Sequence, residues 1–126
     1  MLKVYPAVFH EEDDFWVEFP DLPGCQSCGS TLEETMALAV EALGLYLVDL
    51  LEQGKELPSA SSIRDIEVDG SSVTSYVSVD PNLYRRNTRA VRKTLSIPEW
   101  LADEAEAHNL SLSKVLQDGL KEQLGY

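Results

Sequence analysis

The sequence has little cysteine, little positive charge and no long apolar run. Two cysteines are too few for the disulfide framework of a small secreted protein. No stretch approaches the roughly 20 apolar residues that a transmembrane helix needs. The N-terminus is acidic from Glu11 onward, too early for a signal peptide. We therefore expect a cytoplasmic protein without a membrane anchor.

The sequence also lacks the residues that a metal site or a redox motif needs. A zinc site on the C-x2-C pair would require two further ligands, but His10 and His108 lie in other segments without ligand spacing. A redox C-x-x-C motif should open a helix, whereas Gly29 and Ser30 separate Cys28 from the helix that follows. We expect no metal and no cofactor, and a packed or loop-bound cysteine pair.

Charge is divided unevenly along the 126 residues. Residues 1–84 hold 3 Lys or Arg against 16 Asp or Glu, whereas residues 85–126 hold 7 against 6. Five of those seven cations fall in "RRNTRAVRK", residues 85–93. The body is therefore unsuited to nucleic acid and the basic segment is suited to it. We expect two modules, 1–84 and 85–126.

The first module has the pattern of a small α+β sheet, β-β-β-α-β. The predicted strands cover residues 2–10, 15–20, 25–29 and 73–80, and a helix covers 31–53. Thr31 and Glu34 form a T-x-x-E capping box, and Gly54 is a suitable residue just beyond the helix end. The predicted core face of this helix is Leu32, Met36, Val40, Leu43, Leu47 and Leu50. Further apolar residues, among them Leu45, favour a second contact with a partner.

The second module begins with an alternating segment, residues 89–97, followed by two helical stretches. Val91, Leu95 and Ile97 fall on one face of the segment. A lone strand with one apolar face lacks partners for its backbone and its side chains. The simplest solution is pairing with the same strand of a second chain.

Two helices follow this strand. Pro98 suits the first turn of a helix over 99–109, with Trp100, Leu101 and Ala105 on its buried face. Asn109 tolerates a left-handed break, and Ser111 is a suitable N-cap for a helix over 112–125. The predicted core face of this helix is Leu112, Val115, Leu116, Leu120 and Leu124.

Strand, helix, helix resembles a ribbon–helix–helix DNA-binding module over residues 89–125, through "TLSIPEWL" and "LSLSKVL". In such modules a two-stranded intermolecular ribbon enters the major groove. The resemblance implies a homodimer that binds operator DNA. Further association of such dimers would give a higher oligomer. The implied DNA-binding residues are Arg92, Thr94 and Ser96 at base edges, Ser111 and Leu112 at phosphate, and Lys114, Arg89 and Lys93 as supporting charge.

The N-terminal module resembles the HicB family of antitoxins, through "FPDLPGC", the helix start "GSTLEE" and "GKELP" after the helix. This resemblance implies a truncated RNase H-like fold. It also implies an antitoxin that neutralises a small basic RNA-cleaving toxin, HicA, by occluding its RNA site, and that represses the shared operon through the DNA-binding module.

The acidic run Glu11, Glu12, Asp13 and Asp14 is either an RNA-mimicking toxin contact or a solvated hairpin turn. Trp16 is a further toxin-binding candidate, although packing on the outer sheet face is favoured for it. We expect no enzymatic activity, because no nucleophile and base are evidently placed together. Two alternatives remain: a ribbon–helix–helix regulator with a ligand-sensing N-terminal module, and a residual metal-dependent nuclease.

Overall fold

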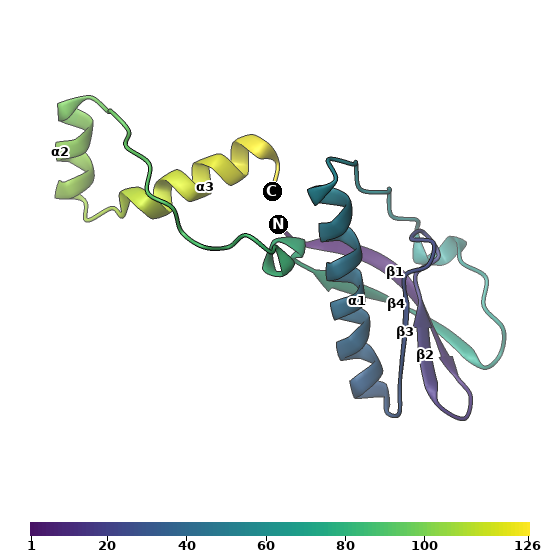
Figure 1. The fold of residues 1–126 in the computed structure, drawn as a ribbon. Helices are drawn as coiled ribbons and strands as arrows, with labels where there is room; N and C mark the ends of the chain where they lie inside the picture. The colour runs from purple at the N-terminus through teal and green to yellow at the C-terminus, as the bar shows by residue number, and fades with distance from the viewer. The chain divides into compact units, whose positions relative to one another are not determined.

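The computed structural model describes residues 1–126, which form two compact units, Met1–Arg86 and Asn87–Tyr126. The first unit contains a four-stranded sheet and one long helix, and the second contains two shorter helices (Figure 1). The predicted α+β class is confirmed. No helix is both long and apolar enough to cross a membrane.

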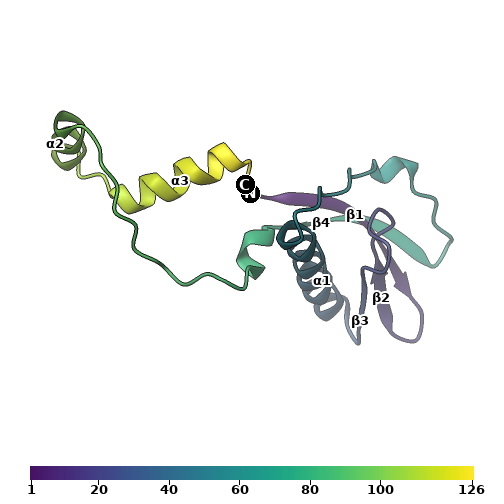
Figure 2. The ribbon, with the colours of Figure 1, turned by 45° about the horizontal axis from the view of Figure 1, so that its top comes forward.

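The sheet of the first unit is antiparallel throughout, with the strand order β3-β2-β1-β4. Its strands are β1 (Lys3–Glu11), β2 (Phe15–Glu18), β3 (Gln26–Gly29) and β4 (Ser72–Val79). The central strand β1 pairs with β2 through a tight turn and with β4, which arrives from much later in the chain. Helix α1 (Leu32–Glu52) covers one face of this sheet, as Figures 1 and 2 show. We call the face of the sheet that α1 does not cover the outer face.

The core lies between the sheet and α1. Alternate residues of the strands face the helix, among them Tyr5, Phe9 and Val17, and Leu43 and Leu47 of α1 meet them. Each fully buried side chain of this size contributes about 1.5–3 kcal/mol. The acceptor for the Tyr5 hydroxyl is the carbonyl of Pro58, so this hydrogen bond ties the segment after α1 to the sheet.

The predicted buried face of α1 needs correction. Leu43 and Leu47 are fully buried, but Leu32 is half exposed and Met36 only half buried. The remaining buried residues are small or lie one position away: Thr35, Ala39, Gly44 and Val48. Thr35, Ala39, Leu43 and Leu47 follow one another at four-residue steps, whereas Gly44 lies against Tyr84. Apolar periodicity alone does not favour the small residues Thr35 and Ala39 as core positions.

The predicted ends of α1 are confirmed with one change. Thr31 is the N-cap, and its Oγ accepts from the Glu34 amide at 3.1 Å. The Glu34 carboxylate, however, accepts from the Ser30 amide at 3.4 Å. Gly54 has φ +72° beyond the last turn, and the Lys55 amide donates to the Leu50 carbonyl at 2.9 Å, which completes a Schellman motif.

The second unit contains α2 (Glu99–Ala107) and α3 (Leu112–Leu124), and residues 87–98 before them carry no regular secondary structure. Asn109 has the predicted left-handed φ, +54°, and Ser111 is the predicted N-cap of α3. The segment 89–97, expected as a strand, has no strand partner within the chain. Its pairing with a second copy stays a prediction.

Candidate functional site

The acidic run occupies the tight turn between β1 and β2. The Glu12 amide donates to the Asp14 carbonyl at 3.1 Å, and Glu11 lies opposite Phe15 at the end of the ladder. All four carboxylates, from Glu11 to Asp14, are exposed. The turn therefore presents a dense negative charge at one tip of the sheet. No three His, Cys, Asp or Glu side chains of the chain are grouped so that they could hold a metal ion.

Trp16 lies next to this tip, on the outer face, and packs on a neighbouring side chain. Its ring stacks on the His10 ring with centroids 3.9 Å apart and an interplanar angle of 13°. Trp16 is half buried as a result. The favoured packing role agrees with this contact, while the open side of the indole remains available to a partner.

His10 joins two carboxylates across the outer face. The Ser72 hydroxyl, which donates to Asp69 at 2.9 Å, lies 2.7 Å from His10 Nδ1. On the other side, His10 Nε2 lies 3.4 Å from a Glu18 carboxylate oxygen. Hydrogen bonds from Ser72 and Ser71 hold the pKa of Asp69 below its usual value.

The segment after α1 folds back over this outer face. The Ser61 amide donates to the Asp21 carboxylate at 2.8 Å, and the Ile63 amide donates to the Tyr76 hydroxyl at 3.1 Å. Between this segment and the sheet lies a pocket of about 480 Å³, whose lining includes Val8 and His10. Its lining also includes four carboxylates, those of Glu18, Asp65, Glu67 and Asp69. Sequence reasoning missed this pocket, because its walls come from segments about 50 residues apart.

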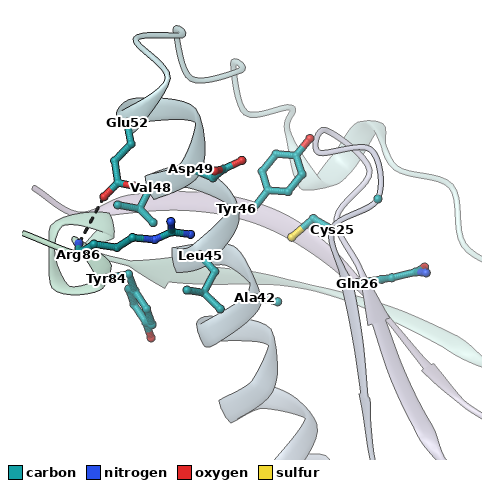
Figure 3. A pocket seen from close by; sticks show the side chains of 11 residues that line it. Cys25, Gln26, Ala42, Leu45, Tyr46, Val48, Asp49, Glu52, Tyr84 and Arg86 are labelled. Atoms are coloured by element: carbon teal, nitrogen blue, oxygen red, sulfur yellow. Dashed lines mark hydrogen bonds between the residues drawn. The ribbon is translucent and has the colours of Figure 1, made fainter.

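A second hollow, of about 470 Å³, lies beside the C-terminal half of α1 (Figure 3). Leu45, Asp49 and Glu52 of the helix contribute to it, together with Tyr84 and Arg86. The Arg86 amide donates to the Glu52 carboxylate at 3.4 Å. Leu45, one of the further apolar residues expected to contact a partner, lies here and is half exposed.

The basic segment of the second unit is solvent-exposed. Arg89, Arg92, Lys93, Thr94 and Ser96 are all exposed. At the start of α3, the Ser111 hydroxyl accepts from the Lys114 amide at 3.4 Å. The amide of Leu112, the first residue of α3, has no acceptor within the helix and is available to an anion.

Apolar side chains of this unit are exposed as well. A largely apolar groove of about 460 Å³ is lined by Leu95, Ile97, Leu101, Leu112, Val115 and Leu116, together with Lys93 and Ser113. On α2 only Ala105 is buried, whereas Trp100 is 66% exposed, and no residue of α3 is buried. The faces predicted as buried are therefore not covered within one chain. Exposure on this scale marks an interaction surface.

An acidic sheet unit joined through an exposed basic segment to a small unit with an uncovered apolar groove is the arrangement of a two-module binding protein. The model of the HicB-like antitoxin of bacterial toxin-antitoxin systems matches residues 5–118. The chain belongs to this family.

A curated relative belongs to the same family. Antitoxin HicB 2 of Photorhabdus laumondii is 30% identical over 89 residues, which cover 68% of this chain and 64% of that protein. The chain spans about half to two thirds of the length of the curated relatives that it matches.

Two solved structures share the fold. A toxin-antitoxin complex from Streptococcus pneumoniae contains a chain 29% identical, with a TM-score of 0.64, covering 98% of this chain and 99% of that one. A complex of HicA3 and HicB3 contains one 26% identical, with a TM-score of 0.52, covering 63% of this chain and all of that one.

Proposed function

We propose that this protein is the antitoxin of a toxin–antitoxin pair, and that its two units perform separate tasks. The N-terminal module, residues 1–84, binds a HicA-type toxin and occludes its RNA site. The C-terminal module, residues 85–126, dimerises and represses the operon by binding DNA. The observation that carries this proposal is the division of one chain into a folded acidic unit, a basic segment over residues 85–93, and a small unit with an uncovered apolar groove.

The toxin-binding half rests on charge complementarity. A protein that binds RNA presents positive charge, and the acidic unit attracts such a surface in competition with phosphate. The exposed run from Glu11 to Asp14 offers the densest negative charge, and Trp16 beside it offers an aromatic surface. The neighbours found in toxin–antitoxin complexes support a partner of this kind.

The DNA-binding half rests on the segment 89–97 and the groove behind it. Pairing of two copies of this segment satisfies its backbone groups and lets the two grooves cover each other. Arg92, Thr94 and Ser96 then project from the opposite face of the ribbon as a symmetric pair. This face enters the major groove, while the Leu112 amide, Ser111 and Lys114 contact phosphate and Arg89 and Lys93 add charge.

A ligand-sensing regulator is the second candidate, and the outer-face pocket near His10 favours it. Four carboxylates line this pocket, so its ligand would be a small organic cation, such as an amine, and not a metal ion. The two functions differ in their partner, because a sensor needs no toxin.

Co-expression with the adjacent open reading frame tests the proposal. We expect the full chain to co-purify with a small basic protein and to restore growth that this protein arrests. A chain ending at Arg86 keeps the whole sheet unit, so it should retain toxin binding and lose operator binding. An adjacent product that neither binds nor arrests growth would favour the sensor.

A further inference from the structure

The hydroxyl of Ser72 lies within hydrogen-bond distance of two side chains on the outer face of the sheet. It is 2.9 Å from Asp69 Oδ1 and 2.7 Å from His10 Nδ1. The Asp69 carboxylate can only accept, and a hydroxyl has one hydrogen to donate. The direction in which Ser72 donates therefore depends on whether His10 Nδ1 carries a proton.

A neutral His10 ring leaves one of these groups without its hydrogen bond. If Ser72 donates to Asp69, Nδ1 must carry the ring hydrogen, and Nε2 is then a bare acceptor beside the Glu18 carboxylate. If Ser72 donates to Nδ1 instead, Asp69 keeps only the amide and the hydroxyl of Ser71 as donors. A ring with both protons removes the conflict: Nδ1 donates to Ser72, Ser72 donates to Asp69, and the Nε2 proton faces Glu18.

The surroundings of the ring favour this second proton. His10 Nε2 is shielded from solvent and forms no hydrogen bond, although a Glu18 carboxylate oxygen lies 3.4 Å away. The stacked Trp16 ring presents the negative face of its π system to the imidazole. Asp65 and Glu67 line the same pocket, whose lining contains no Lys or Arg. Burial of the ring opposes the charge, and these contacts offset that cost.

The network connects the sheet to the segment that folds back over it. His10 lies on β1 and Glu18 on β2, whereas Asp69 is near the end of residues 59–71, which we call the strap. The only regular structure of the strap is the 3-10 turn Ile63–Asp65. Side-chain hydrogen bonds therefore hold it on the outer face, and those of Asp69 hold its end.

We propose that His10 is a proton switch that fastens the strap to the sheet. When the ring takes up its second proton from solvent, the Ser72 hydroxyl turns from His10 to Asp69, which gains its third donor. When the ring loses that proton, Ser72 donates to Nδ1 and the end of the strap loosens over the pocket. Histidine is the side chain that gains and loses a proton between about pH 5 and 8, so the switch acts in the physiological range. It requires neither the toxin nor DNA.

Hydrogen exchange of the full-length protein at about pH 5.5 and about pH 8 tests the switch. Protection factors are compared, because they remove the intrinsic effect of pH on exchange. The amides of Ser71, which donates to Asp69 at 3.1 Å, and of Ile63 should be about tenfold more protected at the lower pH. The amides of β1 should not change.

Four single variants separate the parts of the switch. S72A removes the hydroxyl that links His10 to Asp69, so protection of the strap should be low at both pH values. H10Q has no ring to protonate and should also show no dependence on pH. The matched control S75A removes a hydroxyl from the opposite face of the same strand, and H108Q removes the other histidine. Both controls should keep the full response.

Three results would overturn the proposal. Equal protection of the strap at both pH values in the wild-type chain would show that it does not respond to the proton. A response that survives in S72A would show that Ser72 does not transmit it. A response that is lost in H108Q would assign it to the other histidine.

The fluorescence of Trp16 provides a second measurement that leaves His10 unchanged. In W100F, Trp16 is the only tryptophan, and a protonated imidazole stacked on an indole quenches its emission. Emission should therefore fall between about pH 8 and about pH 5.5. The fall should remain in W100F/S72A, because Ser72 transmits the effect of the proton but does not bind it. Emission that does not depend on pH in W100F would contradict proton uptake at His10.

Discussion

The ring of Tyr84 lies directly against Gly44 in the middle of α1. A Cβ at position 44 would come within 2.9 Å of Tyr84 Cζ and closer still to two other ring atoms. Tyr84 ends the short 3-10 turn Pro81–Tyr84, which follows β4 and packs on the helix. Glycine inside a helix costs about 0.5–1 kcal/mol relative to alanine. Here it provides the space that lets this turn close the core.

Substituting Gly44 by Ala should therefore destabilise the protein, although alanine is the better helix former. The added methyl displaces the Tyr84 ring, and overpacking of this kind costs about 1–3 kcal/mol. Urea denaturation monitored by circular dichroism should show a lower midpoint with an unchanged slope.

The same substitution provides its own control in a second background. Once Tyr84→Ala has removed the ring, the three atoms nearest to a Cβ at position 44 are gone. Gly44→Ala should then stabilise the chain by about 0.5–1 kcal/mol through helix propensity. A destabilisation of equal size in both backgrounds would show that the Tyr84 contact is not the cause.

The two cysteines should differ in reactivity. Cys25 is buried and Cys28 is exposed, and burial raises the pKa of the Cys25 thiol to about 11. Because the thiolate is the reactive form, at pH 8 a disulfide reagent such as Ellman's should modify one thiol quickly. Unfolding in guanidinium should release the second, and C28S should lose the fast phase. Two fast thiols in the native protein would contradict the burial of Cys25.

Because the pKa of the Cys25 thiol is raised in the folded state, the free energy of unfolding depends on pH. The folded state holds the proton of Cys25 more tightly than the unfolded chain, whose thiol has its ordinary pKa near 9.0. The contribution is fully present below pH 9 and is lost as the pH rises through 9 towards 11. C25A should remove this part of the alkaline decline in the free energy of unfolding, whereas C28A should not.

Local signals in the sequence were sufficient for the elements of the first unit. The capping residue Thr31, the turn glycine Gly54 and the alternation along β2 predicted helix and strand positions close to those observed. Such signals act over a few residues, where propensity and capping are decided. The predicted break at Asn109 and N-cap at Ser111 are confirmed for the same reason.

Features that depend on distant segments were beyond this reasoning. Apolar spacing favoured Met36 for the core of α1, but the small residues Thr35 and Ala39 are buried instead. Gly44 is buried against the ring of Tyr84, which lies 40 residues later in the chain. The outer-face pocket likewise needs Asp21 to hold Ser61. The predicted DNA and toxin contacts concern other molecules, so they stay predictions.

Charge reversal at the hairpin tip tests the proposed toxin contact. Lysines at Asp13 and Asp14 replace two exposed acids in a turn held by backbone, so the fold should persist. We expect toxin affinity to fall about tenfold or more at low salt, and the loss to shrink when salt shortens the Debye length from about 10 Å at 0.1 M. Isothermal titration calorimetry at two salt concentrations measures both effects.

The matched control makes the same change in net charge at exposed acids away from the hairpin tip. Glu56 and Glu67 are exposed acids of the segment after α1, away from the tip in sequence. E56K/E67K should weaken toxin binding much less than the tip variant. Equal losses would show that the overall charge of the unit, not the tip, attracts the toxin, and would favour the solvated-turn interpretation of Glu11 to Asp14.

Arg92 and Lys114 should affect DNA binding in different ways, although both are single exposed cations of the second unit. Arg92 reads a base edge in the proposed ribbon, so R92A should cost about 1–3 kcal/mol per half-site and relax the preference at the base pair that it contacts. In the same proposal Lys114 contacts phosphate, so K114A should weaken operator and unrelated DNA alike and reduce the salt slope by about one. Binding titrations on operator and scrambled duplexes at several salt concentrations separate the two effects.

Toxin binding should be unchanged in both variants, because the first unit holds its own core. If R92A weakened the affinity for operator and scrambled DNA equally, the face with Arg92, Thr94 and Ser96 would not be the one that enters the major groove.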